Sequence, residues 1–245
     1  MPNPYDVGSA RLLQEMGFSA LATTSAGLAA TLGRLDMNVT QDELFEHVAG
    51  LAPATGLPLN VDSERCFSED ITGVAATVSA LAELGAAGCS IEDWNPQLGF
   101  IDPIDVAAGR VRAAADGAAQ SGLVLTARCE NHLHGITDLD DTIARIQAYA
   151  ASGADAIYTP GLTDLDQIEK VVKATPLPVN VLLMPGGPSV SELGARGVRR
   201  ISVGSWLSRI SHGAMVAAAQ ELTDQGTISK QNPFLNMSLA GRAWG

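Results

Sequence analysis

The sequence lacks several features that mark secreted, membrane-bound or nucleic-acid-binding proteins. It has only three cysteines, none in a Cys-x-x-Cys pair, so we expect reduced thiols and no disulfide framework. It has no apolar run of about 18 residues, which argues against a membrane-spanning helix. Basic residues number 15 against 27 acidic ones, a net charge of −12, which argues against nucleic-acid and anionic-membrane partners. We find no signal-peptide pattern and expect a cytoplasmic protein.

What the chain does contain is a regular alternation of short apolar runs, which predict strands, and longer alanine-rich amphipathic runs, which predict helices. The predicted strands cover residues 18–25, 57–62, 88–92, 123–128, 156–159, 179–184 and 199–204. The predicted helices cover residues 8–17, 40–54, 70–84, 103–120, 138–151, 164–174, 190–196 and 206–225. This alternation predicts a parallel sheet, and 245 residues suit a (βα)8 TIM-type barrel.

The seven predicted strands are one short of a complete (βα)8 barrel. Only the stub Met-Pro-Asn-Pro-Tyr, residues 1–5, precedes the first helix. Either this stub is the end of a first strand that is short or truncated, or the barrel is imperfectly closed. No break in composition marks a second domain. We therefore predict a single domain over residues 1–245, with residues 226–245 as an irregular polar tail.

Acidic residues follow two of the predicted strands at their carboxyl ends. Asp62 and Glu64 are two residues apart, so on an extended chain they would point the same way. Glu92 and Asp93 end the next strand. Barrel enzymes gather their catalytic groups at these ends. Carboxylates that converge there repel one another unless a cation lies between them, and oxygen ligands favour Mg²⁺, or Mn²⁺, over Zn²⁺. Helix caps or ordinary loop charges are the alternative.

Three further segments could lie at the same end of the barrel. Residues 23–27, Thr-Thr-Ser-Ala-Gly, end a predicted strand, and their backbone N–H groups could hold a carboxylate or phosphate; a simple glycine turn is the alternative. Asp36 follows on a loop that could fold back over the mouth. Arg128 ends an apolar strand and needs a partner, either the acidic cluster or a substrate carboxylate. Glu130 lies on the same side of the chain as Arg128.

Two other patterns are less specific. His132 and His134 have a spacing that metal ligands could use, but we favour polar loop residues because no third histidine is near. Glycine-rich turns at residues 184–189 and 202–205 stand where many barrels hold a phosphate. They support a second hypothesis, a phosphate-binding synthase or isomerase that uses Gly186, Gly187 and Ser205.

Together these segments resemble the isocitrate lyase/phosphoenolpyruvate mutase superfamily over nearly the whole chain. The matching segments are Tyr5-Asp6-Val7-Gly8-Ser9-Ala10, Thr24-Ser25-Ala26-Gly27, Gly33-Arg34-Leu35-Asp36, Asp62-Ser63-Glu64, Ser90-Ile91-Glu92-Asp93 and Ala127-Arg128-Cys129-Glu130. The resemblance implies an (α/β)8 barrel that binds Mg²⁺ and a small 2-oxo acid or its enolate. It also implies a homodimer or homotetramer that exchanges its last helix, here residues 206–225.

The resemblance further implies roles for individual residues. The metal-site acids, several of which act through water, are Asp62, Glu64 and Glu92. The substrate-binding residues are Tyr5, Thr24, Ser25, Ala26 and Arg128, the last of which clamps the substrate. Neither the residues nor the resemblance identifies the general acid or base. The candidates for this role are Asp36, Glu130 and His132.

The departures from the superfamily pattern concern proton transfer and backbone shape. Superfamily lyases carry a cysteine in a Lys-Lys-Cys-Gly-His segment, but residues 93–100 here contain no cysteine, lysine or histidine. The lyase general acid and the lysine of the mutase loop are therefore missing. The glycine–aromatic–glycine turn after the metal acids is here Cys66-Phe67-Ser68, so a backbone with φ > 0 would be strained. Cys66 is the one thiol that we expect near solvent.

From the residues and the resemblance we expect a Mg²⁺-dependent enzyme that acts on a small 2-oxo carboxylate. It would make or break a C–C or P–C bond beside the carbonyl, as a lyase, phosphonomutase or hydrolase. Mg²⁺ and the amides of residues 24–26 would stabilise the enolate as charge develops on its oxygen. A third hypothesis is a non-catalytic barrel that binds a metabolite.

Overall fold

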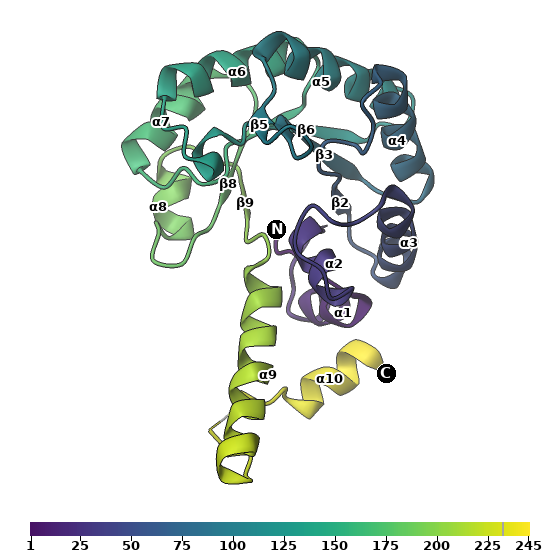
Figure 1. Cartoon of the computed structure of the whole chain (residues 1–245), viewed down its shortest axis with the longest axis vertical. Helices are drawn as coiled ribbons and strands as arrows, with labels where there is room; N and C mark the ends of the chain where they lie inside the picture. The colour runs from purple at the N-terminus through teal and green to yellow at the C-terminus, as the bar shows by residue number, and fades with distance from the viewer. Residues whose placement is uncertain (232) are drawn as a thin grey trace.

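Seven parallel strands form one curved sheet that closes almost completely into a barrel (Figure 1). The computed structural model describes residues 1–231 and 233–245. The strands, in their order round the barrel, are β1 (Leu21–Ala22), β2 (Leu59–Asp62), β3 (Gly88–Glu92), β6 (Val124–Arg128), β7 (Ala156–Tyr158), β8 (Val179–Leu182) and β9 (Arg200–Ser202). Strands β4 (Trp94–Asn95) and β5 (Phe100–Ile101) form a separate antiparallel hairpin. The predicted barrel class is confirmed.

Helices lie on the outside of the barrel, and those from α3 to α8 surround it as an arc (Figure 1). The helices are α1 (Val7–Glu15), α2 (Ser25–Thr31), α3 (Gln41–Leu51), α4 (Ile71–Glu83), α5 (Ile104–Ala118), α6 (Leu139–Ala151), α7 (Leu165–Ala174), α8 (Val190–Ala195), α9 (Trp206–Gln225) and α10 (Met237–Trp244). Two 3₁₀ turns are η1 (Ala52–Ala54) and η2 (Asn131–His134). Helix α3 begins with a capping box between Thr40 and Glu43, as Thr-x-x-Glu predicts.

Apolar side chains fill the space between the sheet and the helices, whereas polar side chains face the inside of the barrel. In β3, Cys89 and Ile91 belong to the hydrophobic core, and Ser90 between them lines a cavity inside the barrel. Asn60 of β2 and Ser202 of β9 line the same cavity. This alternation follows from the period of two in a strand. It gives the barrel a polar interior that can receive a polar ligand.

The first residues of the chain lie between the two edge strands of the sheet, β1 and β9. The Ala22 N–H donates to the Pro2 carbonyl at 3.0 Å. The Met1 nitrogen donates to the Ile201 carbonyl at 2.8 Å. The stub therefore stands where an eighth strand would, and it is as short as the sequence predicts.

The side chain of Asn3 completes this closure. Its Nδ2 donates to the Thr23 carbonyl at 2.8 Å, just beyond β1. Its Oδ1 accepts from the Val203 and Gly204 N–H groups at 2.8 and 2.9 Å, just beyond β9. Asn3 is 5 % exposed, so water cannot replace these bonds. One buried amide thus joins the two edges that the strand ladder leaves apart.

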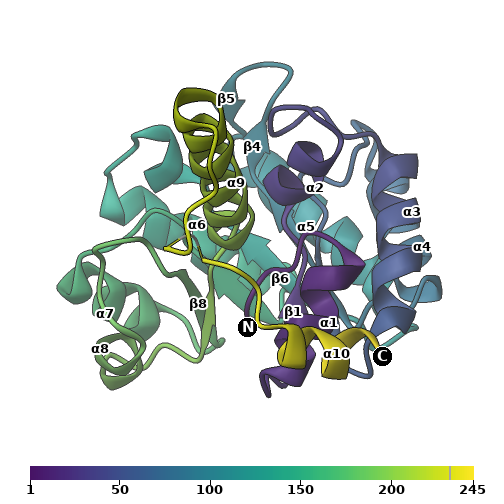
Figure 2. The ribbon, with the colours of Figure 1, turned by 90° about the horizontal axis from the view of Figure 1, so that it is seen from below.

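The polar tail differs from the prediction of an irregular segment over residues 226–245, because α10 forms within it. The Asn236 side chain caps the helix, and Ala240 is buried. The Trp244 Nε1 donates to the Gly8 carbonyl of α1 at 3.2 Å, and Figure 2 shows α10 beside α1. A helix this short is stable mainly through such docking, which composition does not reveal.

Two smaller elements were also not predicted. Residues 25–31, expected as a strand end and a loop, form α2, whose N-cap is Thr24. The loop expected after β3 forms the β4–β5 hairpin. Both are too short for hydrophobic periodicity to show in the sequence.

Helix α9 extends away from the barrel (Figure 1). Ser208 is its one buried residue. Its apolar residues Ile210, Met215 and Val216 are exposed. In residues 1–231 and 233–245, no helix is both long and apolar enough to cross a membrane.

We predict that Asn3→Ala lowers the free energy of unfolding by about 2–4 kcal/mol, because three buried backbone groups lose their partner. Urea unfolding followed by circular dichroism measures this loss. The control is Asn38→Ala, which removes an exposed amide that donates to the Leu35 and Asp36 carbonyls. We expect a loss below about 1 kcal/mol for the control. Equal losses in the two variants would contradict the closure by Asn3.

Candidate active site

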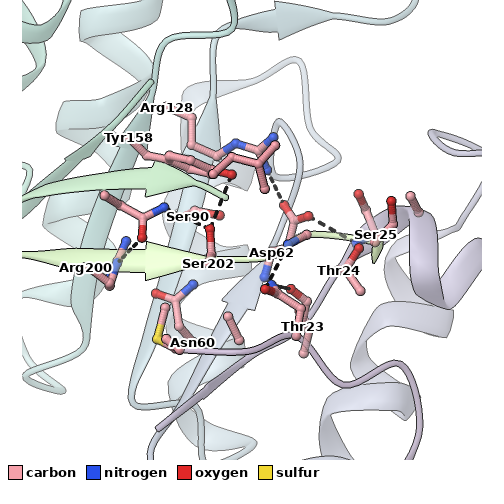
Figure 3. A pocket seen from close by; sticks show the side chains of 18 of the residues that line it. Thr23, Thr24, Ser25, Asn60, Asp62, Ser90, Arg128, Tyr158, Arg200 and Ser202 are labelled. Atoms are coloured by element: carbon pink, nitrogen blue, oxygen red, sulfur yellow. Dashed lines mark hydrogen bonds and ion pairs between the residues drawn. The ribbon is translucent and has the colours of Figure 1, made fainter. Parts of the chain in front are cut away.

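A cavity of about 140 Å³ lies inside the barrel, where polar residues from the carboxyl ends of several strands converge (Figure 3). Its polar lining includes Thr23, Thr24, Ser25, Asp36, Asn60, Asp62, Ser90, Arg128, Tyr158, Asn180, Arg200 and Ser202. Asp62 ends β2, Arg128 ends β6, and Ser202 ends β9. Barrel enzymes hold their catalytic groups at this end.

Arg128 is the centre of charge beside this cavity. Its Nη1 lies 2.6 Å from Asp62 Oδ1, its Nη2 lies 3.1 Å from Glu92 Oε2, and its Nε lies 2.8 Å from Glu130 Oε1. Its guanidinium carbon lies 5.3 Å from the centre of the Tyr158 ring. Arg128 is thus the cation between the converging carboxylates. Of its two possible partners in the sequence analysis, the structure shows the acidic cluster.

The turn after β1 is packed against Asp62. The Ser25 N–H donates to Asp62 Oδ2 at 3.1 Å, and the Asp62 N–H donates to Thr23 Oγ1 at 2.8 Å. Thr24 caps α2 by accepting from the Gly27 N–H. A Cβ on Gly27 would lie 2.4 Å from Thr24 Cγ2, so this tight turn requires glycine. The carboxylate that the Ser25 N–H holds here is therefore one of the protein's own.

The backbone after Asp62 turns sharply, because three residues without the freedom of glycine have positive φ. These values are +48° at Glu64, +60° at Cys66 and +54° at Phe67. Backbone of this kind costs about 1–3 kcal/mol per residue and collects at functional sites. The turn ends the extended alternation, so Asp62 and Glu64 do not point the same way. Glu64 lines a neighbouring hollow with Arg65 and Phe67.

Burial and mutual repulsion disfavour the charged forms of these acids. Burial raises the pKa of Glu64 to about 8, and the charges of Asp62 and Asp36 add to the effect. Burial also raises the pKa of Glu130 to about 6, although Arg128 opposes the shift. The pKa of Glu92 is raised well above its usual value for the same reason. Loss of hydration and the charge of Asp62 raise the pKa of Asp36.

The cluster has the composition of a divalent-cation site. Of five neighbouring carboxylates, those of Asp62, Glu92 and Glu130 pair with the Arg128 guanidinium, whereas Asp36 and Glu64 have no ion pair among the described residues. Glu64 Oε1 is buried and has no hydrogen-bond partner within the described residues. In that same part of the chain, no three acid, imidazole or thiol side chains approach closely enough to share one ion directly. An ion here would therefore keep water ligands, which suits Mg²⁺.

The structure brings some of the predicted proton-transfer and substrate residues to the cavity and not others. Asp36 lines it. Glu130 lies behind Arg128 and is buried. His132 is not in the lining, because its Nε2 lies 3.3 Å from Thr142 Oγ1 on α6. Tyr5 also lies outside the lining, with its ring centre 6.2 Å from that of His212 on α9.

Cys66 is fully buried, which corrects the expectation that it reaches solvent. The left-handed turn directs its thiol inward, where it lies 3.6 Å from Ser63 Oγ. Burial raises the pKa of Cys66 to about 11. Cys89 and Cys129 are buried as well. Since a thiolate is needed for reaction, none of the three is placed to replace the missing lyase cysteine.

The loop that carries this cysteine in superfamily lyases is here the β4–β5 hairpin. The Trp94 ring stacks on the His134 imidazole at 3.6 Å between ring centres. Asp93, before the hairpin, turns away from the cluster: its carboxylate accepts from Tyr149 Oη at 2.5 Å and from the Glu130 N–H at 2.8 Å. Asp93 therefore supports the loops rather than the cavity.

The glycine-rich turns do not form one phosphate site. Gly186 and Gly187 line a separate surface hollow together with Asp164, Asp166 and Glu192. Ser205 lines the barrel cavity. The N–H groups before it that could bind a phosphate donate to Asn3 instead. The negative lining and these occupied donors both disfavour a phosphate.

The sequence analysis gave no role to several polar residues of the cavity, among them Tyr158, Asn180 and Arg200. They lie inside β7, β8 and β9, where the surrounding apolar residues drew attention to core packing. A signal was present, because Asn180 interrupts the apolar strand β8, and Arg200 places a charge at the start of β9. A buried strand that faces a packed core would not carry them.

Comparisons with known proteins match most of the chain. The model of the family described as phosphoenolpyruvate phosphomutase matches residues 1–223. The chain is 34% identical to an oxaloacetate decarboxylase of Bradyrhizobium sp. (strain ORS 278) over 229 residues, which cover 90% of this chain and 76% of that protein. It is 32% identical to an oxaloacetate decarboxylase of Rhodopseudomonas palustris (strain BisA53) over 249 residues, which cover 98% of this chain and 82% of that protein.

Solved structures show the same fold. A candidate lyase/mutase from Burkholderia cenocepacia J2315 superposes with a TM-score of 0.93 at 44% identity, covering 98% of this chain and 88% of that one. Oxaloacetate acetylhydrolase in complex with its product oxalate superposes with a TM-score of 0.87 at 25% identity, covering 99% of this chain and 87% of that one.

We predict that Arg128→Met lowers the free energy of unfolding by about 3–5 kcal/mol at pH 7.5, because it leaves three buried carboxylates without their cation. The deficit should shrink as the pH falls toward 5. The pKa values of Glu92 and Glu130 are already raised, so the folded variant binds protons there before the unfolded chain does, and this stabilises it. Urea unfolding at several pH values measures both effects.

The control for this pH dependence is Arg34→Met. Its partner Glu43 lies 2.8 Å away at the surface, and the bond to Arg34 lowers the pKa of Glu43 to about 2. We expect a much smaller deficit that is constant from pH 7.5 to 5. A deficit of Arg128→Met that stays constant or grows as the pH falls would contradict the charge balance described for the cluster.

Proposed function

The chain belongs to the phosphoenolpyruvate phosphomutase family, an enzyme family, and from this premise we propose that it cleaves a C–C bond beside the carbonyl of a small 2-oxo carboxylate, with Mg²⁺ as its cofactor. The observation that carries the proposal is the acidic cluster at the cavity, in which Asp62, Glu92 and Glu130 pair with the Arg128 guanidinium. The charges of Asp62 and Asp36 also act on Glu64 beside it. Enzymes of this superfamily generally depend on a divalent metal.

The residues that would hold the cation are Asp62, which faces the cavity, and Glu64 and Glu92, which would be reached through water. The unpartnered Glu64 Oε1 and the raised pKa of Glu64 support this assignment, because a cation would restore the charged form. A bound Mg²⁺ would supply positive charge to the carbonyl oxygen of the substrate as it becomes an enolate oxygen.

The protein's own groups would orient the substrate and move protons. The turn at Thr24, Ser25 and Ala26 would position a carboxylate of the substrate. Arg128 would pair with Asp62 and with oxygens of the substrate. Of the three candidates for proton transfer, Asp36 has the best position. It lines the cavity, whereas Arg128 engages Glu130, and His132 contacts α6. The raised pKa of Asp36 suits a group that takes and returns a proton.

Cleavage of a C–C bond is favoured over cleavage of a P–C bond by two observations. The two curated relatives described above are named oxaloacetate decarboxylases. The loop after β3 lacks the lysine that the superfamily's mutases use, and it forms the β4–β5 hairpin instead. Decarboxylation of an oxaloacetate-like acid fits both observations.

We also propose that α9 packs against a second copy of this chain, as the superfamily resemblance implies. The exposed apolar residues Ile210, Met215 and Val216 support this, because an isolated helix rarely leaves such residues in water. Helix α10 is held on α1 of its own chain, so α9 is the part available for exchange. Sedimentation as a monomer at micromolar concentration would contradict this proposal.

We predict that the protein with Mg²⁺ releases pyruvate from oxaloacetate, and that it does not rearrange phosphonopyruvate. Asp62→Asn should lower kcat/KM at least a hundredfold, about 2.7 kcal/mol of transition-state stabilisation, because it weakens the cation site and the Arg128 pair. The control is Asp105→Asn, an exposed acid in the first turn of α5, which should leave kcat/KM unchanged. A coupled lactate dehydrogenase assay measures pyruvate.

Three outcomes would overturn this proposal. Turnover of phosphonopyruvate alone would assign P–C chemistry. Turnover that EDTA leaves intact would remove the metal from the account. Binding of these acids without turnover would favour a barrel that only binds a metabolite.

A further inference from the structure

Arg200 is a half-buried cation that faces the cavity without an acid beside it. It lies on β9, and its guanidinium points into the barrel from the side opposite Asp62 and Ser25 (Figure 3). Its Nη2 donates to Thr126 Oγ1 at 2.6 Å, and its Nε donates to Asn180 Oδ1 at 3.2 Å. Within residues 1–231 and 233–245, no carboxylate lies within salt-bridge distance of it.

Arg128, the other arginine in the lining, differs from Arg200 because it has acidic partners. Two arginines line the cavity, and acids neutralise the nitrogens of Arg128, which pair with Asp62, Glu92 and Glu130. Arg200 has five N–H donors, and two of them donate to neutral oxygens. A buried charge without a counter-charge is costly, and proteins keep such charges where a ligand supplies the partner.

We propose that Arg200 binds a carboxylate of the substrate inside the barrel, so that the substrate of the proposed reaction is a dicarboxylic acid. One carboxylate would pair with Arg200, and the reacting carbonyl would face Asp62 and Arg128 across the cavity. This assignment rests on the proposed function for the identity of the acid, but its anion-binding residue can be tested without turnover.

The neighbours of Arg200 hold it ready for this role. Asn180 accepts from Arg200 and donates from Nδ2 to Ser202 Oγ at 3.0 Å. Ser202 in turn donates to Tyr158 Oη at 3.4 Å. This chain of hydrogen bonds runs across β8, β9 and β7 and fixes the plane of the guanidinium. A planar, fixed guanidinium is suited to pairing with both oxygens of a carboxylate.

The test compares binding of succinate, a four-carbon dicarboxylate, with binding of butyrate, the monocarboxylate of the same length, by calorimetry with Mg²⁺ present. Neither probe has a 2-oxo group, so neither depends on the reaction. We expect the wild type to bind succinate at least tenfold more tightly than butyrate. Arg200→Met should weaken succinate binding at least tenfold and leave butyrate unchanged. Arg200→Lys, which retains the charge, should keep part of the preference.

The matched control is Arg199→Met, which removes the exposed arginine just before β9 and should bind succinate as the wild type does. If Arg200→Met does not fold, Arg200→Lys and Thr126→Val serve in its place, since each perturbs the guanidinium and keeps the barrel filled. Equal succinate affinity in the wild type and the Arg200 variants would overturn the proposal. So would a wild type without preference for succinate, even where it cleaves a 2-oxo acid. Preference for succinate without turnover would support Arg200 and reject the proposed reaction.

Discussion

The three ion pairs of Arg128 are the constraint on which the rest of the site depends. They join the carboxyl ends of β2, β3 and β6 through Asp62, Glu92 and Glu130. Without this guanidinium the acids could not stay together in a buried place, because each would pay the cost of burial and the repulsion of its neighbours. The turn that packs against Asp62 depends on the same cation, because Arg128 holds the Asp62 carboxylate to which the Ser25 N–H donates.

The excess of negative charge indicates that the site does more than stabilise the fold. One guanidinium does not balance five carboxylates, and the raised pKa values of Glu64, Glu92 and Glu130 record the remaining repulsion. The left-handed turn at Glu64 adds backbone strain in the same place. Neither the charge repulsion nor the backbone strain is needed at a site that only stabilises the fold. Their presence together beside a cavity is typical of a site whose balance is completed by a cation and a substrate.

Much of the fold could be predicted from the sequence, because strict alternation of strand and helix patterns leaves few topologies. The placement of Asp62, Arg128 and Asp36 at one mouth could also be predicted, because strand ends meet there. The direction of the side chains that follow a strand could not be predicted. Glu64 and Cys66 turn away from their expected positions because residues other than glycine adopt positive φ, which the sequence identified only as a source of strain. Helix α10 could not be predicted either, since contacts with α1 stabilise it.

The polar residues inside the barrel could not be predicted from the sequence pattern. Asn180 interrupts the apolar strand β8 and Arg200 starts β9, and pattern reasoning gives most weight to the apolar neighbours. Only the closed barrel shows that Arg200, which lies beside Asn180 on the neighbouring strand, also contacts Thr126 of β6 inside the barrel. Within a barrel, the inward residues of alternate strands share a layer, so they act together although they are far apart in the sequence.

The most direct test of this account is a crystal structure of the protein grown with Mn²⁺, measured at a wavelength where manganese scatters anomalously. The account predicts an anomalous peak beside Asp62 in the barrel cavity, with water among the ligands and Arg128 still paired with Glu92 and Glu130. A cavity without such a peak at millimolar Mn²⁺, with the Arg128 ion pairs as described, would show that the cluster needs no cation besides Arg128. It would contradict the proposal that a divalent cation completes the charge balance.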